Sequence, residues 1–202
     1  MRLHNYLTEN ISKDDLIKLL DKNCSQYKKL CEPDSVLYRG VIDSYITGFV
    51  ERSPRSDRKP KDTPQEIHDY INNVFYKSFG WKPRSEGVFA ISSVTDAGYY
   101  AHHVYSDILI FIPFDGFKFI WSPDIVDLYN YLATKQMVDD FNKIKYWDEE
   151  SKEMLDKVLD KYRNDNLRGA MTSLHEIMFK CSKYYLIEHE WKELILDWQE
   201  NK

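Results

Sequence analysis

The stretch Ile108–Trp121, ILIFIPFDGFKFIW, has the strongest strand signal in the chain. Residues 108–113 form an apolar run rich in β-branched and aromatic side chains, and residues 117–121 form a second run. Asp115-Gly116 lies between the two runs and is a turn-forming pair. The stretch therefore predicts two strands that are joined as a hairpin.

Further elements are predicted on both sides of this stretch. Helical periodicity and capping residues predict helices over residues 10–30, 63–75, 95–103, 122–132, 148–162 and 188–199. Strand-forming runs are predicted over residues 36–38, 87–91, 176–179 and 184–187. The first of these strands ends at Arg39-Gly40, and the last two form a hairpin or a bulged pair of strands. Because helices and strands do not alternate strictly, the sequence predicts an α+β domain.

The composition is that of a folded, single-domain protein. The 202 residues are 43% hydrophobic and include 15 Tyr, 10 Phe and 5 Trp, which is enough apolar surface for a core. Cys24, Cys31 and Cys181 form no C-x-x-C pair, so neither a zinc site nor a disulfide framework is predicted and a reducing cytoplasm is expected. The N-terminus has no signal-peptide core, and no segment approaches the roughly 20 apolar residues that span a bilayer. Neither secretion nor membrane insertion is expected.

The net charge of −5 argues against a protein that coats nucleic acid, but it allows a local basic groove. Residues 51–62, ERSPRSDRKPKD, predict an exposed, irregular basic loop. This loop is either a solvated linker or a contact for phosphates. The chain has neither G-x-G-x-x-G nor G-x-x-x-x-G-K-[ST], which disfavours a Rossmann turn or a P-loop.

Three separated motifs carry candidate chemistry: YRG at residues 38–40, GVFAISSVTDAGYY at 87–100 and HEIMFKCSKYYLI at 175–187. In this order they resemble the ADP-ribosyltransferase superfamily, whose fold splits open between two small sheets to bind NAD. The resemblance covers most of the chain and implies an ADP-ribosyltransferase-like split β-sandwich of short strands with flanking helices. A single domain, 1–202, is expected, with a helical N-terminal segment at 1–34, an NAD-cleft core at 35–190 and a C-terminal helix at 191–202.

The resemblance also implies a role for residues of each motif. Glu176 would stabilise the positive charge that develops on the ribose as nicotinamide leaves, and Arg39 would hold the cleft or reach a phosphate. The residues expected to bind NAD are Tyr38, Arg39, Gly40, Phe89, Ser92, Ser93, Tyr99 and Tyr100. Each of them, taken singly, also has an ordinary structural explanation, such as an ion-paired strand end or a core aromatic. No metal is expected.

The acceptor of the ADP-ribose is predicted from two features. Family members that modify arginine carry Glu or Gln two positions before the catalytic Glu, where this chain has Leu174, so arginine is a less favoured acceptor. The basic residues expected to contact the acceptor or the NAD phosphates are Arg52, Arg55, Arg58, Lys59, Lys61 and Arg84. Together these features favour an RNA or DNA base, with a protein side chain as the alternative.

Other interpretations stay open at this level. An NAD glycohydrolase would release nicotinamide without a macromolecular acceptor, and a non-catalytic module would bind NAD or a partner protein. Glu188-His189-Glu190 offers a second, weaker pair of carboxylates. The resemblance further implies a toxin, phage or antiviral-defence protein in the bacterial cytoplasm, with an antitoxin or inhibitor protein as a partner.

Overall fold

The computed structural model describes residues 12–42, 46–55, 59–60, 63–101, 106–138 and 147–201, without the side chains of residues 42, 99–101 and 106. The helices are α1 (Lys13–Asn23), α2 (Ser25–Leu30), α3 (Gln65–Phe79), α4 (Pro83–Glu86), α5 (Val94–Ala101), α6 (Leu128–Thr134), α7 (Glu149–Leu159), α8 (Leu167–Ser173), the 3₁₀ helix η1 (His189–Trp191) and α9 (Lys192–Glu200). The strands are β1 (Tyr38–Ile42), β2 (Phe49–Arg52), β3 (Val88–Ala90), β4 (Ser106–Pro113), β5 (Lys118–Trp121), β6 (Ile177–Lys180) and β7 (Tyr184–Glu188). The predicted α+β class is confirmed.

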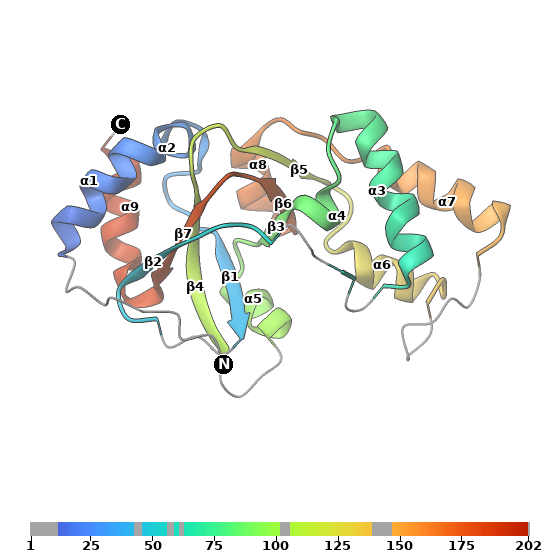
Figure 1. The fold of residues 1–202 in the computed structure, drawn as a ribbon, viewed down its shortest axis with the longest axis horizontal. Coiled ribbons are helices and arrows are strands. Elements are labelled where there is room, and N and C mark those ends of the chain that lie inside the picture. The colour runs from blue at the N-terminus through green and yellow to red at the C-terminus, as the bar shows by residue number, and fades with distance from the viewer. Residues whose placement is uncertain are drawn as a thin grey trace.

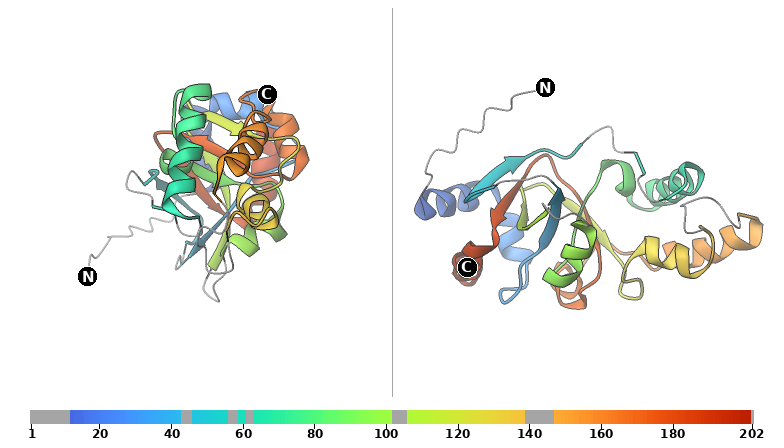
Figure 2. Two further views of the ribbon diagram at one scale, coloured as in Figure 1. Left: turned by 90° about the vertical axis from the view of Figure 1, so that its right-hand side faces the viewer. Right: turned by 90° about the horizontal axis from the view of Figure 1, so that it is seen from below.

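The strands form two antiparallel sheets (Figure 1). The large sheet has the order β1-β4-β7-β2, and the small sheet has the order β3-β6-β5. Helices α1 and α9 lie at one end of the molecule beside the large sheet, while α3, α6 and α7 lie at the other end beyond the small sheet (Figures 1 and 2). The chain passes from the large sheet to the small one after β2 and again after β4, and it returns after β3 and after β6.

Both predicted hairpins are therefore wrong, although their strands are present. β4 and β5 belong to different sheets, and so do β6 and β7. The turn between β4 and β5 is held by the N-terminal helices, because Asp115 N–H donates to the Asn23 carbonyl at 2.7 Å. Gln26 donates its backbone N–H to Asp115 Oδ1, also at 2.7 Å, and its side-chain oxygen accepts from Gly116 N–H. These contacts hold the turn against α1 and α2. β4 and β5 then enter different sheets and do not pair with each other.

The small sheet separates two hydrophobic cores. Phe119, Ile177 and Phe179 face the core that the large sheet shares with α1, α2, α8 and α9. Ile120 and Met178 face the second core, which is formed with α3, α6 and α7. Neighbouring residues of one strand point to opposite faces, so β5 and β6 must be apolar on both sides. This explains why their sequences are continuous apolar runs.

Several predicted boundaries are corrected. The helix predicted over 10–30 is interrupted at Cys24, whose φ of −131° and ψ of 26° end α1 before α2 begins. The helix predicted from residue 122 begins only at Leu128, because Asp127 is its cap and accepts from Asn130 N–H at 2.7 Å. Before it, Ser122 Oγ accepts backbone N–H groups in a local turn. Helix α8 was not predicted.

Two corrections bear on the candidate site. β1 begins at Tyr38, so Arg39 is the second residue of the strand and not its end. Glu51 and Arg52 belong to β2, so the basic stretch begins within a sheet and not within a loop. β1 pairs with β4 and β2 pairs with β7, so both short strands are stabilised by partners that lie far away in the sequence.

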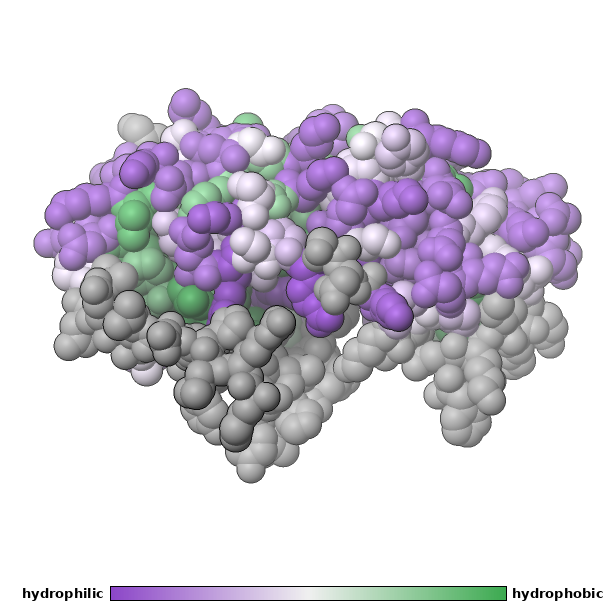
Figure 3. Space-filling model, in the orientation of Figure 1, coloured by the Kyte–Doolittle hydropathy of each residue, from purple (hydrophilic) through white to green (hydrophobic). Residues whose placement is uncertain are grey.

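The surface around α3 and α7 is mainly hydrophilic in Figure 3. Hydrophobic residues show on this face mainly beside β2 and α9. The face over α3 and α7 therefore has the character of a solvated surface.

Candidate functional site

The first two motifs meet where β1 and β3 lie side by side. Tyr38 and Ile91 exchange both backbone hydrogen bonds, with Tyr38 N–H donating at 2.7 Å and Ile91 N–H at 3.0 Å. Next to this bridge, Arg39 Nη1 donates to the Phe89 carbonyl at 2.8 Å. Because β1 is in the large sheet and β3 in the small sheet, these bonds join the two sheets.

Arg39 lies in a partly buried position between the sheets. Burial lowers the pKa of Arg39 from its ordinary value, while Tyr184 and Cys181 act in the opposite direction. Burial raises the pKa of the neighbouring Cys181 thiol to about 12, against the effect of the Arg39 charge. The Cys181 thiol is therefore protonated at neutral pH, and the guanidinium is the charged group of this junction.

Replacing Arg39 with Met tests this structural contact. Met retains most of the side-chain length but has no donor, so the Phe89 carbonyl loses its bond. We expect the free energy of unfolding to fall by about 1–3 kcal/mol in urea titrations. The matched control is Arg163→Met, because Arg163 pairs with Asp165 at the surface and such pairs contribute about 0–1 kcal/mol. Equal losses in the two variants would show that the Arg39 contact stabilises no more than a surface pair.

The serines of the second motif have structural partners. Ser92 Oγ donates to the Met171 carbonyl in α8, and Ser93 Oγ accepts from Asp96 N–H at 3.2 Å in the first turn of α5. Helix α5 packs against β1 and β4. Tyr99 and Tyr100 lie in this helix, but their side chains are outside the described part of the structure.

Glu176 directly precedes β6, and two contacts hold its segment to the loop after β5. Glu176 N–H donates to the Val126 carbonyl at 2.9 Å, and His175 Nδ1 lies 2.8 Å from the Ser122 carbonyl, to which it donates. β6 pairs with β3, and Met178 is the partner of Phe89. Phe89, whose carbonyl accepts the Arg39 hydrogen bond, is thus paired with Met178, which lies two positions after Glu176. The structure brings the three motifs together on β1, β3 and β6.

Glu176 Oε1 is buried. Glu176, Arg84 and Asp127 each act electrostatically on Tyr162, and these four residues are called the Glu176 cluster. Burial raises the pKa of Tyr162 well above its ordinary value, Glu176 and Asp127 raise it further, and Arg84 opposes them. The sequence did not single out Tyr162 as a functional residue. In the sequence, Tyr162 is a polar aromatic residue at the end of a predicted amphipathic helix. This pattern is also typical of a core residue.

The predicted basic residues do not form one group. Arg52 is the strand partner of Tyr184 and lies on β2, at the opposite edge of the large sheet from β1. Lys59 is exposed, as is Arg55, whereas Arg58 and Lys61 are outside the described residues. Arg84 lies in α4 and belongs to the Glu176 cluster.

The alternative pair of carboxylates has a structural role at its first member. Glu188 Oε2 accepts from Gly48 N–H at 2.8 Å, and Glu188 N–H donates to the Gly48 carbonyl at 2.7 Å. Glu190 is exposed in η1. These contacts place Glu188 at the β2–β7 edge and not beside the motifs that meet at β3.

Leu174, two residues before Glu176, has a backbone conformation that is rare for leucine. Its φ is 61° and its ψ is 18°, and its side chain is 51% exposed. This left-handed conformation costs a residue with a Cβ about 1–2 kcal/mol. Little packing offsets this cost, because half of the side chain is in water. The turn before the candidate catalytic residue is therefore strained.

The strain predicts an unusual order of stability among variants. We expect the free energy of unfolding of Leu174→Gly to be about 1 kcal/mol higher than that of Leu174→Ala, since glycine adopts this conformation freely. Both variants lack the apolar side chain, so their difference reports the backbone. Chemical denaturation measures it, and an alanine variant as stable as the glycine variant would contradict a left-handed turn.

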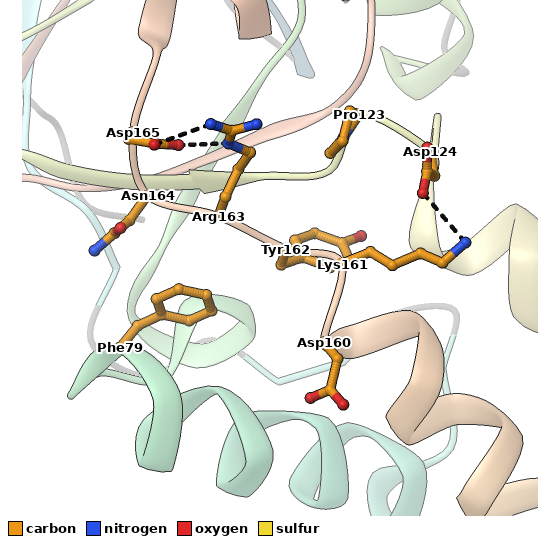
Figure 4. A pocket seen from close by; sticks show the side chains of 9 residues that line it. All are labelled: Phe79, Pro123, Asp124, Asp160, Lys161, Tyr162, Arg163, Asn164 and Asp165. Atoms are coloured by element: carbon orange, nitrogen blue, oxygen red, sulfur yellow. Dashed lines mark hydrogen bonds and ion pairs between the residues drawn. The ribbon is translucent and has the colours of Figure 1, made fainter.

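A shallow hollow of about 530 Å³ is lined in part by Tyr162 (Figure 4). Its charged residues are largely paired, with Arg163 bonded to Asp165 and Lys161 lying 3.2 Å from Asp124. None of the predicted site residues lines it. The hollow is open, and its polar groups are largely engaged with one another.

Within the described residues, no cluster of three or more His, Cys, Asp or Glu side chains could hold a metal ion. Among the helices of the described part, none is long and apolar enough to cross a membrane. A scan against protein-family models, a search of curated proteins and a search of solved structures each find no match to this chain. The functional assignment must therefore be argued from the chain's own residues and geometry.

Proposed function

We propose that this protein is an NAD-dependent mono-ADP-ribosyltransferase with the split two-sheet fold of that superfamily. It transfers ADP-ribose from NAD to a macromolecular acceptor and releases nicotinamide. The observation that carries the proposal is the meeting of three motifs on β1, β3 and β6, through the Arg39–Phe89 bond and the Phe89–Met178 pairing. Segments that are far apart in the sequence and in the order typical of the family are thus neighbours in space.

The reaction would depend mainly on Glu176. The bond between the ribose carbon and the nicotinamide nitrogen breaks, and nicotinamide leaves with the electron pair. The Glu176 carboxylate stabilises the positive charge that develops on the ribose. An acceptor nucleophile then forms the new bond to the ribose carbon and releases a proton. Arg39 keeps the β1–β3 junction closed, so its role is to hold the walls of the site.

We further propose that the acceptor is a base of RNA or DNA. Two features support this choice over a protein arginine. Leu174 stands where arginine-modifying members of the superfamily carry a polar residue, and the basic segment begins at Arg52 in β2, the strand partner of Tyr184. Arginine side chains in such a segment can contact backbone phosphates and leave the base to the catalytic carboxylate.

The proposal is tested with two labelled forms of NAD, one labelled in nicotinamide and one in the adenylate phosphate. RNA, DNA and a protein extract are supplied separately. We expect nicotinamide release and an adenylate label that becomes sensitive to nuclease but not to protease. Protease sensitivity would instead identify a protein acceptor, and release without any macromolecule would identify a glycohydrolase. No release under any of these conditions would overturn the proposed enzyme.

A further inference from the structure

We infer that Tyr162 and Arg84 are positioning residues that hold the Glu176 carboxylate in its working orientation. The inference deepens the proposed function and rests on it. Ser92 is not available for this task, because its hydroxyl donates to the Met171 carbonyl of α8. The two residues that we assign to this task lie outside the three motifs.

Backbone pairing brings Tyr162 to Glu176. Arg163 exchanges two hydrogen bonds with Trp121, at 2.9 and 3.0 Å, and thereby extends the small sheet beyond β5. On its other side Trp121 pairs with Ile177. Tyr162 directly precedes Arg163, and Glu176 directly precedes Ile177. Since Arg163 and Ile177 flank Trp121 on its two sides, Tyr162 and Glu176 lie at the same end of the small sheet.

Tyr162 packs on the side of the small sheet that faces the second core. Its ring lies 4.9 Å from the Phe75 ring, in the core that also contains Met178. Glu176 and Met178 are two residues apart in an extended segment, so their side chains point to the same face. Tyr162 is only 7% exposed, so its hydroxyl is removed from bulk water. In such surroundings a hydrogen bond or charge is stronger than at the surface.

Arg84 reaches the same cluster from the side of α3. Its backbone N–H donates to Asn72 Oδ1 at 3.1 Å, and its Nη2 donates to Thr63 Oγ1 at 2.9 Å. Asn72 lies one helical turn before Phe75, on the face of α3 that contacts Tyr162. The Arg84 Nε is buried, and within the described residues it has no hydrogen-bond partner. The Arg84 charge also acts on Tyr162, so a buried cationic donor remains available in the Glu176 cluster.

The variants that test this inference are Tyr162→Phe, Arg84→Lys and Arg84→Gln. Tyr162→Phe keeps the ring and its packing and removes only the hydroxyl. The control is Arg168→Gln, which removes an exposed cation from α8. We expect kcat for nicotinamide release to fall about 10- to 100-fold in Tyr162→Phe and in Arg84→Gln, with KM for NAD changed little, because a misplaced catalytic group mainly lowers the rate. Arg84→Lys should retain an intermediate kcat. An unchanged kcat in both Tyr162→Phe and Arg84→Gln would overturn the inference.

A second measurement needs no NAD. With tyrosines labelled at ¹³Cζ, the NMR signal of Tyr162 is the one that Tyr162→Phe removes. It should shift in Glu176→Gln and in Arg84→Gln but not in Arg168→Gln, and an unmoved signal in Glu176→Gln would rule out contact between the two side chains. If the wild type releases no nicotinamide, the proposed function fails together with the positioning role. If it releases nicotinamide while Tyr162→Phe and Arg84→Gln match it, only the positioning role fails.

Discussion

Replacing Glu176 with Gln should lower nicotinamide release by about 10²- to 10³-fold, the loss that follows when one preorganised electrostatic group is removed from an active site. The amide has nearly the same shape as the carboxylate, so the polar cluster around it keeps its packing. What is lost is the negative charge, which acts only when positive charge develops on the ribose. Binding of NAD, measured by titration calorimetry, should change much less than kcat.

The matched control is Glu190→Gln. Glu190 is the second member of the alternative E-x-E pair and is exposed in η1, so its neutralisation should leave the rate unchanged. If Glu190→Gln lost activity and Glu176→Gln did not, the catalytic carboxylate would lie at the end of β7 and the proposed site would be wrong. A loss of NAD binding in Glu176→Gln, with kcat retained, would indicate a binding role only.

The sequence predicted strands better than their partners. Residues 117–121 were identified as a strand because their apolar run is a local property. Their membership in the small sheet depends on contacts of the preceding turn with Asn23 and Gln26, about ninety positions away. No local pattern contains such information. The sequence pattern predicted pairing with the nearest strand in the chain, whereas tertiary contacts place the two strands in different sheets.

The candidate site shows the same division. The order of the motifs predicted that Arg39, Phe89 and Glu176 form one site. Arg39 bonds to Phe89, and β3 pairs with the strand that follows Glu176, while the site itself stays a prediction. The partner of Ser92 and the membership of Tyr162 could not be predicted. Both depend on α8 and on the extra pairing at Arg163, which are determined by packing and not by a motif.

Phe179 is one of the side chains through which the two sheets contact each other. Its ring centroid lies 5.2 Å from that of Phe111 in the large sheet and 6.1 Å from that of Phe119 in the small sheet. Phe117 is a further neighbour at 5.7 Å. The residue is fully buried. Since each ring pair adds to the burial of apolar surface, this position joins strands that the backbone assigns to different sheets.

Phe179→Ala should therefore lower the free energy of unfolding by about 3–5 kcal/mol, because it removes buried surface and leaves a cavity that the surrounding rings fill only in part. Phe179→Leu retains much of the volume and should cost clearly less. Urea titrations of both variants measure the difference. As a control, Tyr76→Ala truncates an aromatic that is 55% exposed and should cost little. If Phe179→Ala were as mild as Tyr76→Ala, the two sheets could not share the core described above, and the meeting of the three motifs at their junction would lose its structural basis.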